Sequence, residues 1–424
     1  MKNILIAIRS IFKKGRHNVM KIVSLGIGLA VGLVLIAKVY FEQSYDDFYP
    51  DRDRVYQVWA KYQQNGGELK DYPQTSGGIA PTMQQQIPEI ETGTRYTSFG
   101  DWTFTMTDTK MKYSGRCIIA DSCFFDILPR PMLIGNAKEV LSTPMYVLIS
   151  SRIAKNIGGD VIGKNFTVDN SPGRTMTIGG VFEEVPENSH SRYDVIVSMA
   201  SAGRFMWEGS PTNMLGNDRY ISYVKLHKGV NPLALEEQVR TFVNSYFPPE
   251  EQQKVGLSID FSFHKLDNLH KELPQVKRMT WILSLLAFAL IFTAVMNYIL
   301  IVISSIVNRS KEVAVHKCYG ASENNIHGMM FGEALVHIVL SLILALLLIL
   351  AFRGTVEELL ATSLDSLLLS NGSLVLLGIC ILVFFVSGFM PGSLYARIPV
   401  ASAFRNYREN KRIWKKALLL VQFV

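Results

Sequence analysis

Four long apolar segments stand out along the chain, at residues 22–41, 279–307, 335–352 and 374–391. An α-helix rises 1.5 Å per residue and the hydrocarbon core of a bilayer is about 30 Å thick, so about 20 apolar residues span it. The segments therefore predict four transmembrane helices. The second is longer than a span needs, so we expect it either to tilt in the bilayer or to project beyond it as a stalk.

Residues 42–278 differ from these segments, because they are polar and alternate short strand-like runs with turn signals. A region of this size can bury its own core. We therefore predict a mixed α+β domain inserted between the first two spans. Strands are expected at 54–62, 102–106, 146–150, 175–182, 194–199 and 220–226, and helices at 79–87, 151–156 and 232–246.

The formal net charge is +7, and the basic residues gather at both ends of the chain, in 1–21 and 392–416, whereas the connection 353–373 is acidic. The positive-inside rule places both ends in the cytoplasm, and residues 42–278 and 353–373 on the outer side. Apolar positions at helical spacing in 1–21 predict an amphipathic helix on the membrane surface. Topology and contact with membrane lipids explain the basic excess, so nucleic acid is not an expected partner.

The last eight residues, 417–424, form an apolar run that is too short to span a bilayer. Because it follows a basic segment, we expect it to begin a fifth span, and the natural product to continue with a second copy of the same plan. The alternative is a short apolar tail that rests on the membrane.

Motifs for catalysis or metal binding are not found in the sequence: no HExxH or paired ligand set, and no GxSxG. Residues 158–165 approach a P-loop but lack the final Ser or Thr that reaches Mg²⁺, so a β-turn is the better interpretation. We expect no catalytic residue, no cofactor and no metal. Cys117 and Cys123 share the inserted domain, and they either pair or are two small buried side chains.

Two features of the spans concern packing and charge. Ser24, Gly28 and Gly32 form a small-xxx-small row, which lets helices approach closely, although glycine is also simply common in membrane helices. Lys38 is near one end of its span, where it can extend to the interface, and His337 is near the cytoplasmic end of another. Without polar groups at the midplane, a secondary transporter is disfavoured.

The connection 308–334 between the second and third spans has helical spacing at Val313, His316, Lys317 and Gly320. Gly320 is placed to end a helix, and Ser322 to cap the next one. The pattern predicts a short helix across the cytoplasmic membrane face. Such a helix can convey motion from a cytoplasmic partner, or it can be an ordinary connection.

This connection resembles the coupling-helix signature of MacB/FtsX-like (type VII) ABC transporter permeases. The matching residues are Arg309, Glu312, Val315, Lys317, Gly320, Ala321, Ser322, Glu333 and Ala334, whereas Val313, Ala314, Cys318 and Tyr319 depart from the pattern. Residues 147–164 and 178–190, the latter with Asn188-Ser189-His190, are similar to motifs of the periplasmic core domain of the same family.

The resemblance implies a permease subunit of a bacterial inner membrane that pairs with a separate cytoplasmic ATPase, which would bind the ATP and Mg. The inserted domain would be periplasmic, and its work would be efflux, lipoprotein extraction or cell-envelope regulation. Further partners would be a second permease half or chain, and a periplasmic adaptor or substrate protein. Arg309, Glu312 and Lys317 would contact the ATPase, Val313 and His316 would pack into its groove, and Gly320 would set the turn. The alternative is a membrane sensor that reports ligand binding to a signalling partner.

Overall fold

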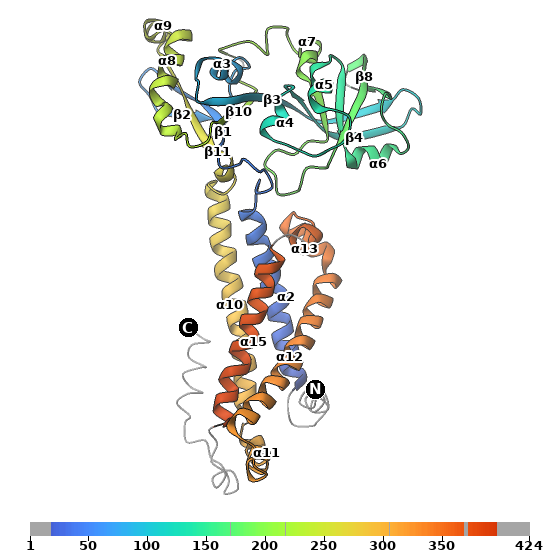
Figure 1. The fold of residues 1–424 in the computed structure, drawn as a ribbon, viewed down its shortest axis with the longest axis vertical. Helices are drawn as coiled ribbons and strands as arrows, with labels where there is room; N and C mark the ends of the chain where they lie inside the picture. Colours follow the sequence, from blue (N-terminus) through green and yellow to red (C-terminus); the bar gives the residue numbers. More distant parts are fainter. Residues whose placement is uncertain (1–17, 170, 217, 305, 369–371, 397–424) are drawn as a thin grey trace. The chain divides into compact units, whose positions relative to one another are not determined.

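The computed structural model describes the chain except residues 1–17, 170, 217, 305, 369–371 and 397–424 (Figure 1). The predicted amphipathic helix and the predicted fifth span therefore lie outside the described residues, except for the last residues of the former. The chain forms two compact units. The helical unit comprises the chain up to Gln43 and from Pro274 onward, and the inserted domain comprises Ser44–Leu273.

The helical unit is built from four long helices, α2 (Asn18–Gln43), α10 (Pro274–Ser304), α12 (Glu323–Ala351) and α15 (Ser373–Ala396) (Figure 1). In the described part of the chain, α2, α10 and α12 are long and apolar enough to cross a membrane, and α15 has a described apolar stretch at Leu374–Val386. The helices α2 and α15 contain the predicted spans 22–41 and 374–391, and α10 and α12 contain all but the last residues of the predicted spans 279–307 and 335–352. The helix α10 starts at Pro274, ahead of the expected start of its span at residue 279.

Short helices connect the long ones. The helix α11 (Ile306–Cys318) lies between α10 and α12, where the sequence predicts a short helix. The connection 353–373 contains α13 (Arg353–Leu360) and α14 (Leu364–Leu368). Apolar side chains of the long helices and of α11 form one continuous core, so α11 belongs to the packed body of the helical unit.

The inserted domain is built on a mixed sheet, which confirms the predicted α+β class. Its described strands follow the order β11-β1-β10-β3-β4-β9-β6-β8-β5, with β2 added to β1, and β7 paired with β3 and β8. The strands are β1 (Val55–Gln64), β2 (Leu69–Tyr72), β3 (Ile90–Met106), β4 (Lys112–Ala120), β5 (Met132–Ile134), β6 (Tyr146–Ser150), β7 (Asn165–Val168), β8 (Ser171–Phe182), β9 (Val195–Ser198), β10 (Ile221–Leu226) and β11 (Leu257–Lys265).

Helices cover this sheet and complete three apolar cores. They are α3 (Ile79–Gln86), α4 (Phe124–Ile127), α5 (Ala137–Ser142), α6 (Ser151–Ile157), α7 (Ala202–Phe205), α8 (Glu236–Tyr246) and α9 (Pro249–Val255), with 3-10 turns at Met199–Ser201, Pro232–Leu235 and Leu266–Asn268. The predicted strands correspond to β1, β3, β6, β8, β9 and β10, and the predicted helices to α3, α6 and α8. Sequence patterning missed β4, where Ser114, Gly115 and Arg116 interrupt the apolar residues, and it missed β11 although apolar and polar residues alternate there. The short strands β2, β5 and β7 were not predicted either.

All four cysteines are free, so Cys117 and Cys123 do not pair in this structure. Cys117 is fully buried, and burial raises the pKa of its thiol well above the usual value. The P-loop-like residues 158–165 form an irregular turn before β7, with left-handed backbone at Gly158, Gly159 and Gly163. That geometry agrees with the expected turn and lacks the helix that a P-loop requires.

Candidate functional sites in the helical unit and the inserted domain

The helix α11 ends in a hydrogen-bonded cap centred on Gly320. Gly320 has a left-handed φ of 85°. Its N–H donates to the carbonyl of Lys317 at 3.0 Å, and the N–H of Ala321 donates to the carbonyl of His316 at 3.0 Å. These two bonds form a Schellman motif, for which glycine is favoured because it has no Cβ. Ser322 then caps α12 by accepting from the N–H of Asn325 at 3.3 Å, so the turn between α11 and α12 is tightly defined.

The two faces of α11 differ in exposure. Val313 is 1% exposed and packs in the core of the helical unit, so in this structure it is not available to a partner's groove, contrary to our expectation. His316 is exposed, and Glu312 and Lys317 are half-buried, each with a polar or electrostatic interaction inside the chain. Tyr319 is 89% exposed. The side chain of Arg309 lies outside the described residues. Residues 312, 315, 316 and 319 therefore form one accessible stripe at helical spacing.

The glycines of α2 lie directly against α10. A methyl group on Gly28 would be 2.2 Å from Cβ of Ala294, and one on Gly32 would be 2.4 Å from Cγ1 of Ile291. Ser24, the first residue of the predicted row, is half-buried. Gly26, which the row does not include, faces α12, where a methyl group would be 2.9 Å from Leu344. Small residues therefore bring α2 into close contact with two neighbouring helices.

The sequence predicts that Lys38 extends to the membrane interface, but in the structure its side chain is buried. Its Nζ lies 2.6 Å from Oε1 of Glu42 and donates to Oγ1 of Thr362 at 2.7 Å. The side chains of Lys38 and Glu42 are 8% and 6% exposed. A charge this buried needs a partner, which explains why a lysine is tolerated inside α2. His337 is also buried, with Nδ1 3.2 Å from the hydroxyl of Tyr298.

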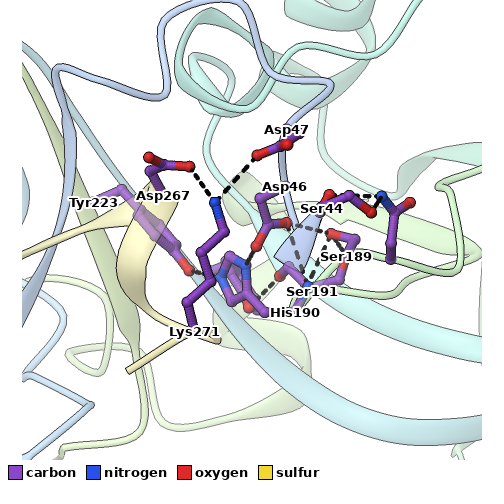
Figure 2. Close-up of polar contacts among 11 residues, drawn as sticks. Ser44, Asp46, Asp47, Ser189, His190, Ser191, Tyr223, Asp267 and Lys271 are labelled. Carbon is purple, nitrogen blue, oxygen red and sulfur yellow. Dashed lines mark hydrogen bonds and ion pairs between the residues drawn. The ribbon is translucent and has the colours of Figure 1, made fainter. Parts of the chain in front are cut away.

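In the inserted domain, the residues that follow α2 in the chain are held by the Asn188-Ser189-His190 motif (Figure 2). Asp46 is fully buried and has a left-handed φ of 59°. Its carboxylate accepts from Oγ of Ser189 at 2.9 Å and from the N–H of His190 at 3.3 Å, and lies 2.7 Å from Nδ1 of His190. Asn188 donates to the carbonyl of Ser44 at 2.7 Å. The motif therefore anchors residues 44–46.

The contact continues from His190 into the sheet. Nε2 of His190 hydrogen-bonds to the hydroxyl of Tyr223 on β10, and Tyr96 on β3 bonds to Ser191. Burial raises the pKa of Tyr223 well above its usual value, and that of Tyr96 to about 12. Both tyrosines therefore keep their protons at neutral pH, and Asp46 is connected to the centre of the sheet.

The residues that precede α10 in the chain contact the same segment, the one that follows α2. Lys271 bridges Asp267 at 2.9 Å and Asp47 at 3.4 Å (Figure 2). The rings of Tyr45 and His270 stack with centroids 3.4 Å apart. We call the residues Ser44–Asp47, Asn188–Ser191, Tyr223 and Asp267–Lys271 the junction. Within the domain, it holds together the two chain connections to the helical unit.

Residues 20–242 match the model of the MacB-like periplasmic core domain, and residues 284–400 match that of the FtsX-like permease C-terminal region. The chain belongs to the MacB/FtsX-like family of ABC transporter permeases. A comparison with curated proteins found no match.

Three solved structures resemble this MacB/FtsX-like permease over about half of its chain. A domain described as part of a permease protein from Porphyromonas gingivalis is 33% identical, with a TM-score of 0.47, covering 51% of this chain and 91% of that one. The periplasmic region of MacB from Actinobacillus actinomycetemcomitans is 14% identical (TM-score 0.35; 49% and 87%). The extracellular domain of the transporter YknZ from Gram-positive bacteria is 10% identical (TM-score 0.34; 48% and 98%).

In this MacB/FtsX-like permease, sequence reasoning found the Asn-Ser-His motif but not its partners. Asp46 and Tyr223 carried no sequence signal, because each is a single polar residue far along the chain from His190. Tyr319 was noted only as a departure from the family pattern, although it directly follows α11 and is 89% exposed. Among the described residues, no group of three or more His, Cys, Asp or Glu is placed to hold a metal ion.

Proposed function

We propose that this permease transmits ATP-driven motion from a cytoplasmic ATPase to the inserted domain, for efflux, lipoprotein extraction or cell-envelope regulation. ATP and Mg would be bound by the ATPase. The permease would lie in a bacterial inner membrane, with its inserted domain on the periplasmic side. A second permease half or chain, and an adaptor or substrate protein, would complete the assembly.

The observation that carries the proposal is the accessible stripe on α11. Glu312, Val315, His316 and Tyr319 combine a charge, an aliphatic side chain and two rings on one helix face. Aromatic residues of this kind often dominate the energy of a protein–protein contact. The opposite face of α11 is buried in the helical core through Val313 and Ala314. A partner that moves the exposed face would therefore move the packed helices too, because a close-packed interior resists deformation.

Close packing among the long helices supports the second step. At Gly28 and Gly32, on two successive turns of α2, the side chains of Ala294 and Ile291 on α10 occupy the space in which a Cβ would lie. In the inserted domain, the junction ties together the residues that follow α2 and those that precede α10. A displacement of the two helices would thus reach the domain through connections that are held as one structure.

The test is to purify the full-length permease from native membranes in mild detergent and to ask whether an ATPase co-purifies. We expect a nucleotide-binding subunit with the wild type, and its loss or weakening with Glu312→Lys. The matched control is Glu358→Lys, which reverses an exposed charge on α13. If no ATPase is recovered, or if both variants behave alike, the proposal fails, and a kinase in its place would favour the sensor hypothesis.

A further inference from the structure

The inserted domain contains a polar cleft of about 460 Å³ that is separate from the junction. Its walls are β4, the start of α6 and the segment 183–194 between β8 and β9. The side chains that line it include three arginines, Arg116, Arg152 and Arg192, and four carboxylates, Asp101, Glu184, Glu187 and Asp194. The cleft therefore combines the backbone of a strand with side chains of both charges.

One wall of the cleft is an open strand edge. The strand β4 pairs with β3 over its whole length, from Lys112 to Ala120. On its other side, β4 pairs with β9 only from Cys117 to Ala120. The N–H of Arg116 donates to Oδ2 of Asp194 at 3.0 Å, and its carbonyl accepts from the N–H of Asp194 at 2.8 Å. The backbone of Arg116 therefore points away from β3.

The backbone groups of alternate residues in a strand point to the same side. The N–H and C=O of Ser114 therefore also point away from β3, into the cleft. Ser114 is exposed, and no described strand pairs with it on that side. Its backbone N–H and C=O can therefore hydrogen-bond to an added strand that lies on the same side of β4 as β9.

The charged side chains that flank this edge are only partly paired with one another. Arg192 is exposed and forms no ion pair with any residue that the structure describes. Arg116 is 54% exposed, and its Nε is 3.9 Å from a carboxylate oxygen of Asp101, which is a loose contact. Arg152 is already held by Asp194 at 2.5 Å and by Glu184 at 3.3 Å. Two guanidinium groups are thus accessible to a carboxylate of an incoming chain.

We propose that this cleft binds an extended, acidic segment of a partner polypeptide, which adds to the sheet as a strand beside residues 112–114 of β4. Backbone hydrogen bonds to Ser114 would supply affinity, and Arg116 and Arg192 would select acidic side chains, as in other cases of strand addition. The segment 183–194 that lines the cleft also carries His190 of the junction. Occupancy of the cleft is therefore connected to the residues that hold the two helix connections.

The experiment measures binding of a fluorescent, end-blocked peptide of alternating threonine and glutamate to the full-length protein in detergent. Two control peptides replace glutamate by lysine, or carry N-methyl groups on alternate backbone nitrogens. We expect the glutamate peptide to bind, and each control peptide to bind at least about tenfold more weakly. The N-methylated peptide keeps the charge but cannot pair as a strand, so it separates strand addition from simple charge attraction.

Variants test the two components on the protein. Arg192→Glu and Ser114→Pro should each weaken binding at least about tenfold. Arg204→Glu, an exposed charge reversal on α7, and Ser114→Ala, which keeps the backbone N–H, should bind as the wild type does. No binding of the glutamate peptide at about 1 mM, or equal binding of the N-methylated peptide or of Arg192→Glu, would overturn the proposal. None of these outcomes depends on an ATPase, so the test is independent of the proposed function.

Discussion

Oδ2 of Asp46 lies 2.7 Å from Nδ1 of His190, although 144 positions separate the two residues in the chain. This contact joins the segment that follows α2 to the Asn-Ser-His motif, and through Tyr223 to the centre of the sheet. A family motif that is recognised in the sequence thus acts as an anchor for a residue outside it.

Replacement of Asp46 should destabilise the inserted domain. Asp46→Ala leaves buried donors of Ser189 and His190 without their acceptor and places a Cβ-bearing residue without a polar side chain at φ 59°. We expect a loss of about 3 kcal/mol in the free energy of unfolding, seen as a lower midpoint in thermal melts of the purified protein. Asp46→Asn keeps one acceptor and tolerates this backbone, so it should lose clearly less. Equal melting of wild type and Asp46→Ala would show that the anchor contributes nothing.

The close contact of α2 with α10 predicts the effect of larger residues at Gly28. Gly28→Leu must push α10 away, because even a methyl group would lie 2.2 Å from Ala294. We expect a cost of at least about 1–3 kcal/mol, measured as a lower melting midpoint or a lower yield of folded protein in detergent. Gly378→Leu is the control, since a methyl group there meets no described atom within 4 Å. A tolerated Gly28→Leu would contradict the packing.

The buried pair of Lys38 and Glu42 predicts an asymmetric pattern of stability. Lys38→Met leaves the carboxylate of Glu42 in a nearly water-free site without its cation, which we expect to cost about 3–5 kcal/mol. The double variant Lys38→Met/Glu42→Gln removes both charges, so it should recover a large part of that loss. Thermal melts of the three proteins check this order. If the single variant melted at the wild-type temperature, the pair would be without energetic importance.

Tyr319 should matter for the partner and not for the fold. Its side chain is 89% exposed, so Tyr319→Ala should leave the melting midpoint unchanged. If α11 binds an ATPase, loss of this aromatic residue should weaken the association about tenfold or more, measured by titration of the purified ATPase. Tyr72→Ala, an exposed tyrosine of β2, serves as the control. Unchanged affinity for Tyr319→Ala would remove this residue from the proposed contact.

The acidic residues beside Arg54 predict a pH dependence. Hydrogen bonds from Arg54 and then Lys225 hold the pKa of Asp51 below its usual value. A carboxyl whose pKa is lowered by folding stabilises the folded state above its unfolded pKa of about 3.9, and this stability is lost as the pH falls through the folded value. Asp51→Asn should therefore be less stable near neutral pH by up to about 1 kcal/mol, and the difference should start to shrink below about pH 4 and vanish once the pH has fallen past the lowered folded pKa.

Thermal melts of both proteins across this pH range check the prediction. Asp53→Asn, on the exposed side of the same segment, should show no such trend. A difference that grows as the pH falls would contradict the assigned sign.

The sequence by itself determined the four apolar helices, the inserted α+β domain and the turn at Gly320. These depend on local properties, namely hydrophobic length, alternation and the absence of a Cβ, which each segment carries without its neighbours. Tertiary structure alone decided that Val313 faces the core, that Lys38 is paired with Glu42 and Thr362, and that Ser114 lies on an open edge. It also brought Asp46 to His190. These relationships depend on which distant segments pack together, and that choice follows from the summed burial of many side chains, which no local pattern records.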